Sequence, residues 1–267
     1  MKNLLFIPCY NCEKQIIRVL NSFDDGIVKY FDEIIVINNR STDTTESVAV
    51  KFASEHPELP LTIIRNDNNY GLGGSHKVAF NYARINGFDY VTVLHGDDQG
   101  DIHNLLPLIE SGEYKDYDCC LGARFMPGSE LHGYSKFRTF GNVVYNIAFS
   151  VLSGKKIFDL GSGLNMYSTE MLKSRFYHRF PDNLTFNCYM ILASAALKHK
   201  VLFFPVSWKE TDQVSNVKMV RQAFNTILIP MEYAATSYNS FLKKERREKA
   251  YDKYTAKIIF SNRSKKL

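Results

Sequence analysis

Short apolar segments that alternate with amphipathic helical segments are the feature that most limits the fold of this chain. Between the first two apolar segments, Ile16, Leu20 and Phe23 recur at spacings of three and four residues, as on the buried face of a helix. Strands that alternate with helices in this way predict an α/β fold with a mostly parallel central sheet and helices on both faces. The five apolar segments of the first half are Leu4–Pro8, Glu33–Asn38, Leu61–Arg65, Asp89–His95 and Asp118–Ala123.

The second half of the sequence is less regular. Arg124–Ser135 contains one proline and two glycines without periodicity and is predicted to be a loop. No internal repeat or low-complexity linker interrupts the chain, which favours a single domain. Residues 1–218 are expected to form it, and residues 219–267 a helical, basic carboxyl-terminal extension packed on it or trailing from it. The remaining elements expected here are strands at Leu164–Tyr167 and Val201–Trp208 and helices at Phe137–Leu152, Phe186–Leu197 and Val217–Lys249, the last interrupted near Pro230.

Positive charge is concentrated at the carboxyl terminus. The net charge is +5, and the segment from Lys243 to Leu267 alone has ten Lys/Arg against three Asp/Glu, so the rest of the chain is slightly acidic. A solvated terminal helix accounts for such a tail, and so does attraction to an anionic membrane surface, helped by Ile258, Ile259 and Phe260. No nucleic-acid partner is expected.

The cellular location predicted from the sequence is cytoplasmic. No apolar run approaches the length of a membrane span, and the run Leu4–Ile7 is too short for a signal-peptide core. Five cysteines, an odd number, do not suggest a disulfide framework. With the basic tail, peripheral attachment to the inner face of the membrane is the alternative location.

A cluster of acids follows the fourth apolar segment, in the run from Val91 to Asp101. Carboxylates at the carboxyl edge of a parallel sheet lie where open α/β folds bind ligands, and they repel one another unless cations neutralise them. A divalent metal that holds a phosphorylated substrate explains the cluster. Taken alone, the segment favours the other explanation, a turn at Asp97 and Asp98 followed by a helix cap at Asp101.

Polar residues follow the other strands of the first half in the same way. Because parallel strands end at one edge, these residues are expected to lie together and to form a nucleotide site. Tyr10 is suited to stacking on a base, glycines allow close backbone approach, and Lys77 is suited to meeting a phosphate. The nucleotide-binding residues predicted are Pro8, Tyr10, Asn11, Asn38, Ser41, Gly71, Lys77 and Gly96.

Several motifs in this order resemble those of the family 2 glycosyltransferases, and most closely the branch of dolichol- and polyprenyl-phosphate sugar transferases. The resemblance implies a GT-A fold, a nucleotide-diphospho-sugar donor, a divalent metal (Mn²⁺ or Mg²⁺) and inversion at the anomeric carbon. It spans roughly residues 4–218. The motifs are Ile7-Pro-Cys-Tyr-Asn11, Val36-Ile-Asn-Asn-Arg-Ser-Thr-Asp43, Asn69-Tyr-Gly-Leu-Gly-Gly74, Leu94-His-Gly-Asp-Asp-Gln99, Gly122-Ala-Arg124, Ser162-Gly163 and Phe204-Pro-Val-Ser-Trp208 with Ser215.

The chain departs from the family pattern at two places. Asn38 and Asn39 stand where acids are usual, and His95-Gly-Asp97 stands where Asp-x-Asp normally holds the metal. Asp97 is the expected metal contact, with His95 and Asp98 as further ligands. Imidazole is softer than carboxylate and suits Mn²⁺ better than Mg²⁺.

The acceptor side of the reaction is less clearly marked. Asp182 is the candidate general base for a hydroxyl acceptor, with a helix cap as its structural alternative. A lipid phosphate is already ionised and attacks without a general base. Because the sequence marks no clear general base, a polyprenyl-phosphate acceptor is favoured over a glycan intermediate of cell-surface polysaccharide synthesis. A soluble glycan-extending transferase with Asp182 as base is the alternative. Arg124 is expected to balance phosphate charge, and Lys136, Arg138 and Ser215 to contact the acceptor or its phosphate.

Two functions of other classes fit parts of the sequence. Cys9-Tyr-Asn-Cys12 lies between a strand and a helix, as in thiol oxidoreductases of the thioredoxin type. That reading leaves the other motifs unexplained. The replaced metal motif also fits a non-catalytic nucleotide-sugar binder.

Overall fold

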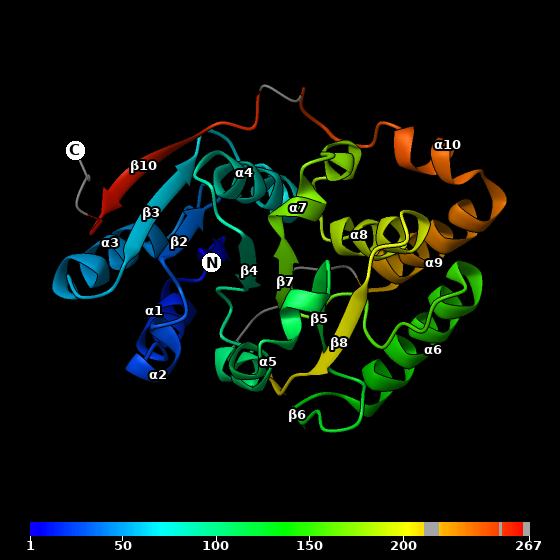
Figure 1. Cartoon of the computed structure of the whole chain (residues 1–267), viewed down its shortest axis with the longest axis horizontal. Helices are drawn as coiled ribbons and strands as arrows, with labels where there is room; N and C mark the ends of the chain where they lie inside the picture. Colours follow the sequence, from blue (N-terminus) through cyan, green and yellow to red (C-terminus); the bar gives the residue numbers. More distant parts are fainter. Residues whose placement is uncertain (211–218, 251–252, 264–267) are drawn as a thin grey trace.

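A computed structural model describes residues 1–210, 219–250 and 253–263, and in these ranges an eight-stranded sheet is covered by helices on both faces (Figure 1). The strand order across this sheet is β10-β3-β2-β1-β4-β7-β5-β8. A separate pair of two-residue strands, β6 (Leu131–His132) and β9 (Trp208–Lys209), lies in the loops beyond it. The strands of the large sheet are β1 (Asn3–Cys9), β2 (Glu33–Asn38), β3 (Leu61–Asn66), β4 (Tyr90–Leu94), β5 (Cys119–Ala123), β7 (Leu164–Ser168), β8 (Val201–Pro205) and β10 (Ala256–Ser261).

The helices predicted at Phe137–Leu152 and Phe186–Leu197 are confirmed to within one residue at each end, whereas the one predicted to reach Lys249 ends at Lys243. Within the described ranges, none combines the length and the apolar composition that crossing a bilayer requires. The α-helices are α1 (Glu13–Asn21), α2 (Asp25–Val28), α3 (Thr45–Glu55), α4 (Gly71–Ile85), α5 (Leu106–Ser111), α6 (Lys136–Ser153), α7 (Thr169–Leu172), α8 (Phe186–Ala196), α9 (Met219–Ala235) and α10 (Tyr238–Lys243), and short 3₁₀ helices are η1 (Ile102–Leu105), η2 (Glu113–Asp116) and η3 (Phe176–Arg179).

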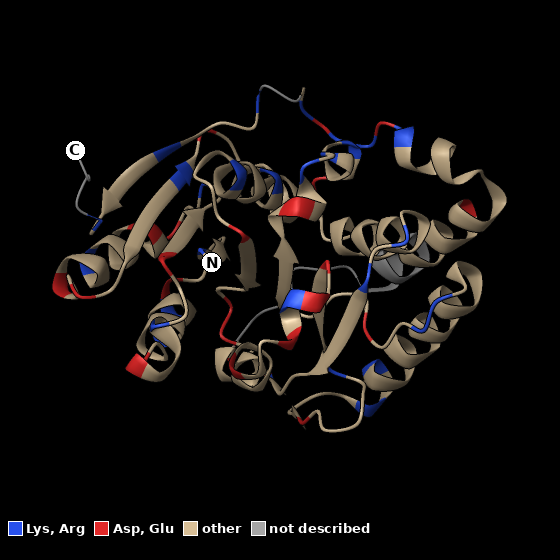
Figure 2. Cartoon of the chain, viewed as in Figure 1, with Lys and Arg blue, Asp and Glu red and all other residues tan. Residues whose placement is uncertain are grey.

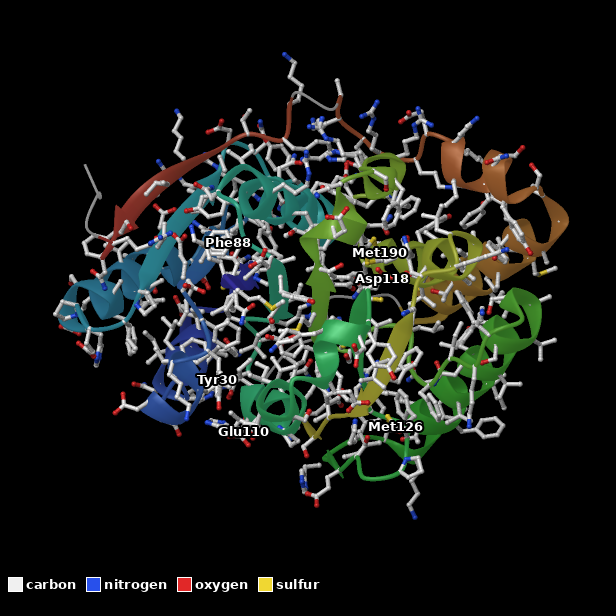
Figure 3. All side chains as sticks on the ribbon, in the orientation of Figure 1. Tyr30, Phe88, Glu110, Asp118, Met126 and Met190 are labelled. Atoms are coloured by element: carbon white, nitrogen blue, oxygen red, sulfur yellow. The ribbon has the colours of Figure 1, made fainter. Side chains whose placement is uncertain are left out.

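The central strands are buried on both faces, which explains their nearly continuous apolar sequences. In β1, Leu4 and Phe6 join one core cluster and Leu5 and Ile7 the other, as the two-residue period of a strand requires. One cluster packs under α4 and α8 and the other under α1, α3 and α5, and side chains fill the space between sheet and helices (Figure 3). The predicted α/β fold with helices on both faces is confirmed.

The strand directions place the carboxyl ends of β1 and β4 side by side. β3, β2, β1 and β4 are parallel to one another, and β5 is parallel to β8. β7 lies antiparallel between β4 and β5. Loops that follow β1, β2 and β4 therefore meet at one edge of the sheet, and the segment Ser162–Gly163 that precedes β7 reaches the same edge.

The carboxyl-terminal extension is part of the domain, and the prediction that it is helical is wrong for its last segment. β10 is a strand that pairs antiparallel with β3, from Ala256 opposite Asn66 to Ser261 opposite Thr62. The apolar and β-branched residues of the tail favour a strand, and this strand pairs with the edge of β3. An edge left open could pair with another chain. The predicted interruption near Pro230 is also wrong, because Pro230 lies inside α9 and the break follows Ala235.

Candidate active site

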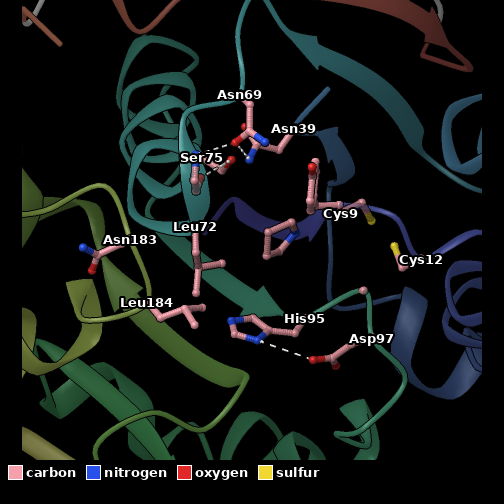
Figure 4. A pocket seen from close by; sticks show the side chains of 14 residues that line it. Cys9, Cys12, Asn39, Asn69, Leu72, Ser75, His95, Asp97, Asn183 and Leu184 are labelled. Carbon is pink, nitrogen blue, oxygen red and sulfur yellow. Dashed lines mark hydrogen bonds and ion pairs between the residues drawn. The ribbon is translucent and has the colours of Figure 1, made fainter. Parts of the chain in front are cut away.

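A cavity of about 400 Å³ opens at the carboxyl ends of β1 and β4 (Figure 4). Loops after β2 and β3 form one wall, and the segment between η3 and α8 forms another. Four of the predicted nucleotide-binding residues line this cavity, and the predicted metal residues His95 and Asp97 lie at its floor. Its lining residues are Pro8, Cys9, Tyr10, Cys12, Asn39, Asn69, Gly71, Leu72, Ser75, His95, Gly96, Asp97, Asn183 and Leu184.

The predicted residues that line the cavity have the properties expected of a nucleotide site. The Tyr10 side chain is 49% exposed, so its ring face is accessible to a base. Gly71 has a φ of +67°, and a Cβ there would lie 2.4 Å from the carbonyl oxygen of Asp182. A Cβ on Gly96 would lie 2.5 Å from the Cys9 sulfur. Glycine at both positions is therefore required by the local packing.

Three of the predicted nucleotide-binding residues lie outside this cavity and support its loops. The Asn38 side chain accepts from the Ser41 amide (2.8 Å) and donates to Glu46 (2.7 Å). The Asn11 amide donates to the Ser41 hydroxyl (3.0 Å), and the Asn11 side-chain oxygen accepts from the amide of Thr42 (2.8 Å). Asn38 and Ser41 line a separate hollow. In the structure Asn11, Asn38 and Ser41 position these loops, and their direct contact with a nucleotide stays a prediction.

The neighbouring Asn39 ties the cavity wall together. Its side-chain oxygen accepts from the Tyr70 amide (2.8 Å) and from Asn66 (2.9 Å), and its nitrogen donates to Asn69 (2.8 Å). Asn69 in turn accepts from the Gly71 amide at 3.0 Å. This network fixes the loop that precedes α4 against the end of β2.

His95 and Asp97 form a pair at the end of β4. The distance between His95 Nδ1 and Asp97 Oδ2 is 4.0 Å, and the buried Nε2 of His95 has no hydrogen-bond partner. Burial, together with the charge of Arg124, lowers the pKa of His95 to about 4, so its ring is neutral near pH 7. Burial raises the pKa of Asp97 to about 6. A neutral imidazole and a carboxylate destabilised by desolvation are both suited to binding a divalent cation.

Asp98 does not join this pair, which contradicts its prediction as a metal ligand. Its carboxylate lies 2.6 Å from Arg18 Nε and 3.1 Å from Lys209 Nζ, and the residue lines a different hollow. It is absent from the lining of the cavity that Asp97 lines. Across the described residues, no three His, Cys, Asp or Glu side chains gather in a metal-binding group. Among the described residues that line the cavity, His95 and Asp97 stay the predicted cation ligands.

Gly163 explains why the Ser162-Gly163 motif belongs to this site. The His95 amide donates to the Gly163 carbonyl at 2.9 Å. A Cβ on Gly163 would lie 2.9 Å both from Cγ of His95 and from a ring carbon of Trp208. The missing side chain thus allows the imidazole and the indole to pack against the start of β7.

Lys77 and Asp182 bind each other, and neither lines the cavity. Lys77 Nζ lies 2.5 Å from Asp182 Oδ1 and donates to the Phe180 carbonyl at 2.6 Å. Asp182 also accepts from the Tyr254 hydroxyl (2.7 Å to Oδ2) and from the Glu248 amide (2.9 Å). The Lys77 side chain is fully buried and that of Asp182 is 3% exposed. These contacts contradict the predictions that Lys77 meets a phosphate and that Asp182 is a general base.

Arg124 is also held by a carboxylate. Its guanidinium makes two hydrogen bonds to Asp159, at 2.8 Å and 2.9 Å, and lies 5.0 Å from the Trp208 ring. Burial opposes the charge of Arg124, but the adjacent Asp159 outweighs it and raises the pKa. Arg124 is absent from the cavity lining, so the predicted phosphate contact stays a prediction.

The remaining acceptor residues lie at the start of α6. Arg138 binds both oxygens of Glu210 at 2.5 Å and 2.6 Å and stacks 4.6 Å from the Tyr134 ring. Lys136 is exposed. Ser215 lies outside the described residues.

The two cysteines of the C-x-x-C motif line the cavity but lack the properties of a redox site. Both are free and buried. Burial, with the hydrogen bond between Cys9 and Cys12 as a further cause, raises the pKa of the Cys9 thiol well above its usual value. A reactive thiol of this type needs a lowered pKa, so the thioredoxin-type interpretation is disfavoured.

Several lining residues had no role in the sequence prediction. Leu184 and Asn183 come from the segment before α8, and Ser75 from the first turns of α4. Their types are common on any surface, and no local pattern distinguishes them. The partner of Arg124, Asp159, was missed because the pair joins residues 35 positions apart.

Comparisons with known proteins agree with this geometry. The sequence model described as "Glycosyl transferase family 2" matches residues 5–176. An uncharacterized protein of Methanocaldococcus jannaschii is 24% identical over 62% of this chain and 65% of its own length. A UDP-N-acetylglucosamine–dolichyl-phosphate N-acetylglucosaminyltransferase of Methanococcus voltae is 24% identical over 63% of this chain and 70% of its own. A dolichyl-phosphate beta-glucosyltransferase of Trichomonas vaginalis is 21% identical over 86% of this chain and 71% of its own.

Solved structures share the fold. A Pyrobaculum calidifontis mannosyltransferase in complex with GDP-Man and Mn²⁺ superposes with a TM-score of 0.56 at 18% identity, over 90% of this chain and 72% of that chain. Staphylococcus aureus TarS in complex with UDP gives a TM-score of 0.57 at 20% identity, over 90% and 68% of the two chains. Together with the family match, these likenesses confirm the GT-A fold, and the chain belongs to glycosyltransferase family 2.

Proposed function

We propose that this chain transfers a sugar from a nucleotide-diphospho-sugar to a polyprenyl or dolichyl phosphate, with inversion at the anomeric carbon. The observation that carries the proposal is the cavity in which Tyr10, Gly71 and Gly96 face the His95–Asp97 pair. It combines an exposed aromatic ring, close backbone approach and two cation ligands in one space of about 400 Å³, which is the size range of small-ligand sites.

The donor diphosphate is expected to bind through a divalent cation at His95 and Asp97. His95 Nδ1 and Asp97 Oδ2 lie 4.0 Å apart, so both atoms can reach one ion, and the desolvated carboxylate favours a bound cation. When bound, the ion would offset the charge of the departing nucleoside diphosphate. The imidazole favours Mn²⁺ over Mg²⁺. Tyr10 would stack on the base, and Gly71 and Gly96 would let the backbone approach the ribose and phosphates.

The acceptor is inferred from the lack of a free general base among the described residues of the site. Among the described residues that line the cavity, Asp97 is the one acid, and the proposal assigns it to the cation. Asp182 is buried against Lys77, and Glu210 is bound by Arg138. A phosphate monoester attacks without losing a proton, whereas a sugar hydroxyl needs a base. These contacts support a lipid phosphate and disfavour a glycan-extending transferase that uses Asp182. The names of the relatives from M. voltae and T. vaginalis point to the same acceptor class.

A transfer assay tests the proposal. UDP-GlcNAc, UDP-Glc and GDP-Man are each incubated with the protein, Mn²⁺ and either a short polyprenyl phosphate or the matching polyprenol. Transfer to the phosphate alone is expected. Asp97→Asn should lower the rate by about 100-fold or more, because the cation contributes several kcal/mol to catalysis. Asp101→Asn is the control, since Asp101 caps η1 and lies outside the cavity.

The outcomes separate the alternatives. Transfer to polyprenol at an equal rate would contradict the acceptor assignment. Tight binding of a donor without transfer or hydrolysis would instead identify a non-catalytic nucleotide-sugar binder.

A further inference from the structure

A row of large apolar side chains is exposed along α6. Phe137, Phe140, Val144, Ile147 and Val151 recur at spacings of three and four residues, so they share one face of the helix. They are 84%, 68%, 45%, 58% and 73% exposed. The opposite face, with Asn146 and Phe149 buried, packs on the domain. At 1.5 Å per residue the row from Phe137 to Val151 extends over roughly 21 Å, and we call it the α6 stripe.

The charged residues that the α6 segment itself contributes are all positive, and Arg138 among them is paired with Glu210. From residue 136 to residue 158 the sequence contains three lysines and one arginine and no acid. Lys136 lies at the first turn, and Lys155 and Lys156 follow the last turn. In Figure 2, Lys and Arg colour the start of α6 and the segment after it, and no acid colours the helix. All three lysines are exposed, and within the described part of the chain none has an acidic partner.

More basic residues extend the second of these ends. Lys155 and Lys156 line a hollow of about 490 Å³ together with Lys198 and Lys200. Both of these lysines are exposed. One end of the α6 stripe is therefore continuous with four lysines, which together form an anion-attracting surface.

We propose that the α6 stripe is inserted into the interface of an anionic lipid bilayer, with the lysines at both ends contacting lipid phosphates. An exposed apolar face with basic residues at its ends has the properties of an interfacial helix. A second copy of the chain is a poorer occupant. Two α6 helices packed face to face would bring lysine against lysine in either the parallel or the antiparallel orientation, and like charges repel.

The location of the stripe relative to the cavity deepens this proposal, and this step rests on the proposed function. α6 begins directly after Tyr134, whose ring lies 6.0 Å from the Arg124 guanidinium and 4.6 Å from that of Arg138. The amino-terminal end of the membrane-contacting helix thus adjoins the loops where an acceptor phosphate is predicted to bind. A lipid whose chain remains in the bilayer would present its phosphate at this end.

Flotation with lipid vesicles tests the membrane surface without any donor or acceptor. The full chain is mixed with vesicles of phosphatidylcholine alone or with added phosphatidylglycerol, and binding is expected only to the second kind. Phe140→Ser combined with Ile147→Ser should lower binding by about tenfold or more, because two large apolar side chains no longer enter the interface. Lys155→Ala combined with Lys156→Ala should lower it by about 30-fold at low salt.

Matched controls lie on other faces. Ile85→Ser removes an apolar side chain that is 81% exposed at the end of α4, and Lys51→Ala removes an exposed lysine of α3. Neither should change vesicle binding. Equal losses in these controls would contradict the proposal, as would binding that the α6 variants leave unchanged.

Sedimentation of the protein without vesicles tests whether a second copy of the chain, and not a membrane, covers the α6 stripe. If the wild type sediments as a dimer without vesicles and the Phe140→Ser, Ile147→Ser variant as a monomer, the α6 stripe is a subunit interface and the membrane proposal is wrong. Mn²⁺-dependent binding of nucleotide, measured in the same variants without lipid, reports separately on the cavity. Lost vesicle binding with intact nucleotide binding therefore concerns the stripe alone.

Discussion

Replacing Asp182 by asparagine separates a structural role from a catalytic one. In the structure the carboxylate neutralises the fully buried ammonium of Lys77 at 2.5 Å and accepts a hydrogen bond from Tyr254. In Asp182→Asn the lysine keeps the Phe180 carbonyl at 2.6 Å but loses its counter-ion. The variant should therefore lose stability, and any loss of transfer should follow from unfolding.

The expected magnitude follows from the burial of the pair. Removing one partner of a buried ion pair costs about 3–5 kcal/mol, because the other charge stays buried and uncompensated. Out of a total stability of about 5–15 kcal/mol, this is a large fraction. At about 2–4 °C per kcal/mol for a chain of this size class, the melting temperature should fall by roughly 10 °C. Lys77→Met combined with Asp182→Asn should recover part of the loss, since no unpaired charge remains.

Thermal and chemical unfolding measure these differences, and transfer is assayed well below the melting temperature. Glu170→Gln is the control, because it removes an ion pair with Lys173 whose side chains are 76% and 67% exposed, and its cost should stay below about 1 kcal/mol. If Asp182→Asn keeps wild-type stability but loses transfer about 100-fold or more, Asp182 is a general base and the structural reasoning is wrong.

Three further predictions follow from contacts around the cavity. Gly163→Ala should lower the free energy of unfolding by about 1–3 kcal/mol and weaken Mn²⁺-dependent nucleotide binding, because the added Cβ would lie 2.9 Å from His95. Unfolding measures the first effect and titration calorimetry the second. Unchanged binding would contradict the reasoning. Cys9→Ser combined with Cys12→Ser should keep transfer activity. In the wild type, iodoacetamide should modify Cys9 far more slowly in the native protein than in denaturant at the same pH, because burial raises the pKa of the thiol. Fast labelling of the native protein would favour the redox alternative. Tyr254→Phe should lower stability by about 1.5–3 kcal/mol, because Asp182 loses a hydrogen bond to a charged group, and an effect near zero in unfolding would contradict that bond.

The sequence predicted the structure correctly where a pattern of residues has a single physical explanation. Continuous apolar runs such as Ile34–Ile37 are buried on both faces of a parallel sheet, and they were predicted from composition alone. β10 was missed because Ala256–Ser261 becomes a strand through the open edge of β3, which is 190 positions away at the pair Ala256–Asn66. No local pattern in a basic tail contains that information.

The residues of the candidate site also differ in how far their local sequence predicts their position. Positions at strand ends, such as Tyr10 and Asp97, were placed correctly because parallel strands bring their carboxyl ends together. Lys77 was misread because its partners Asp182 and Tyr254 are more than 100 residues further along the chain. A lysine near a glycine-rich loop has the same local sequence whether it faces a phosphate or a buried carboxylate.

The two asparagines that replace acids in the family pattern are required by the network that they form. A carboxylate only accepts hydrogen bonds, whereas an amide both accepts and donates. Asn39 accepts from the Tyr70 amide and donates to Asn69, and Asn38 accepts from the Ser41 amide and donates to Glu46. An acid at position 38 would face the carboxylate of Glu46, and an acid at position 39 would leave the Asn69 oxygen without this donor. The two asparagines therefore keep the wall of the cavity hydrogen-bonded, although they depart from the family pattern.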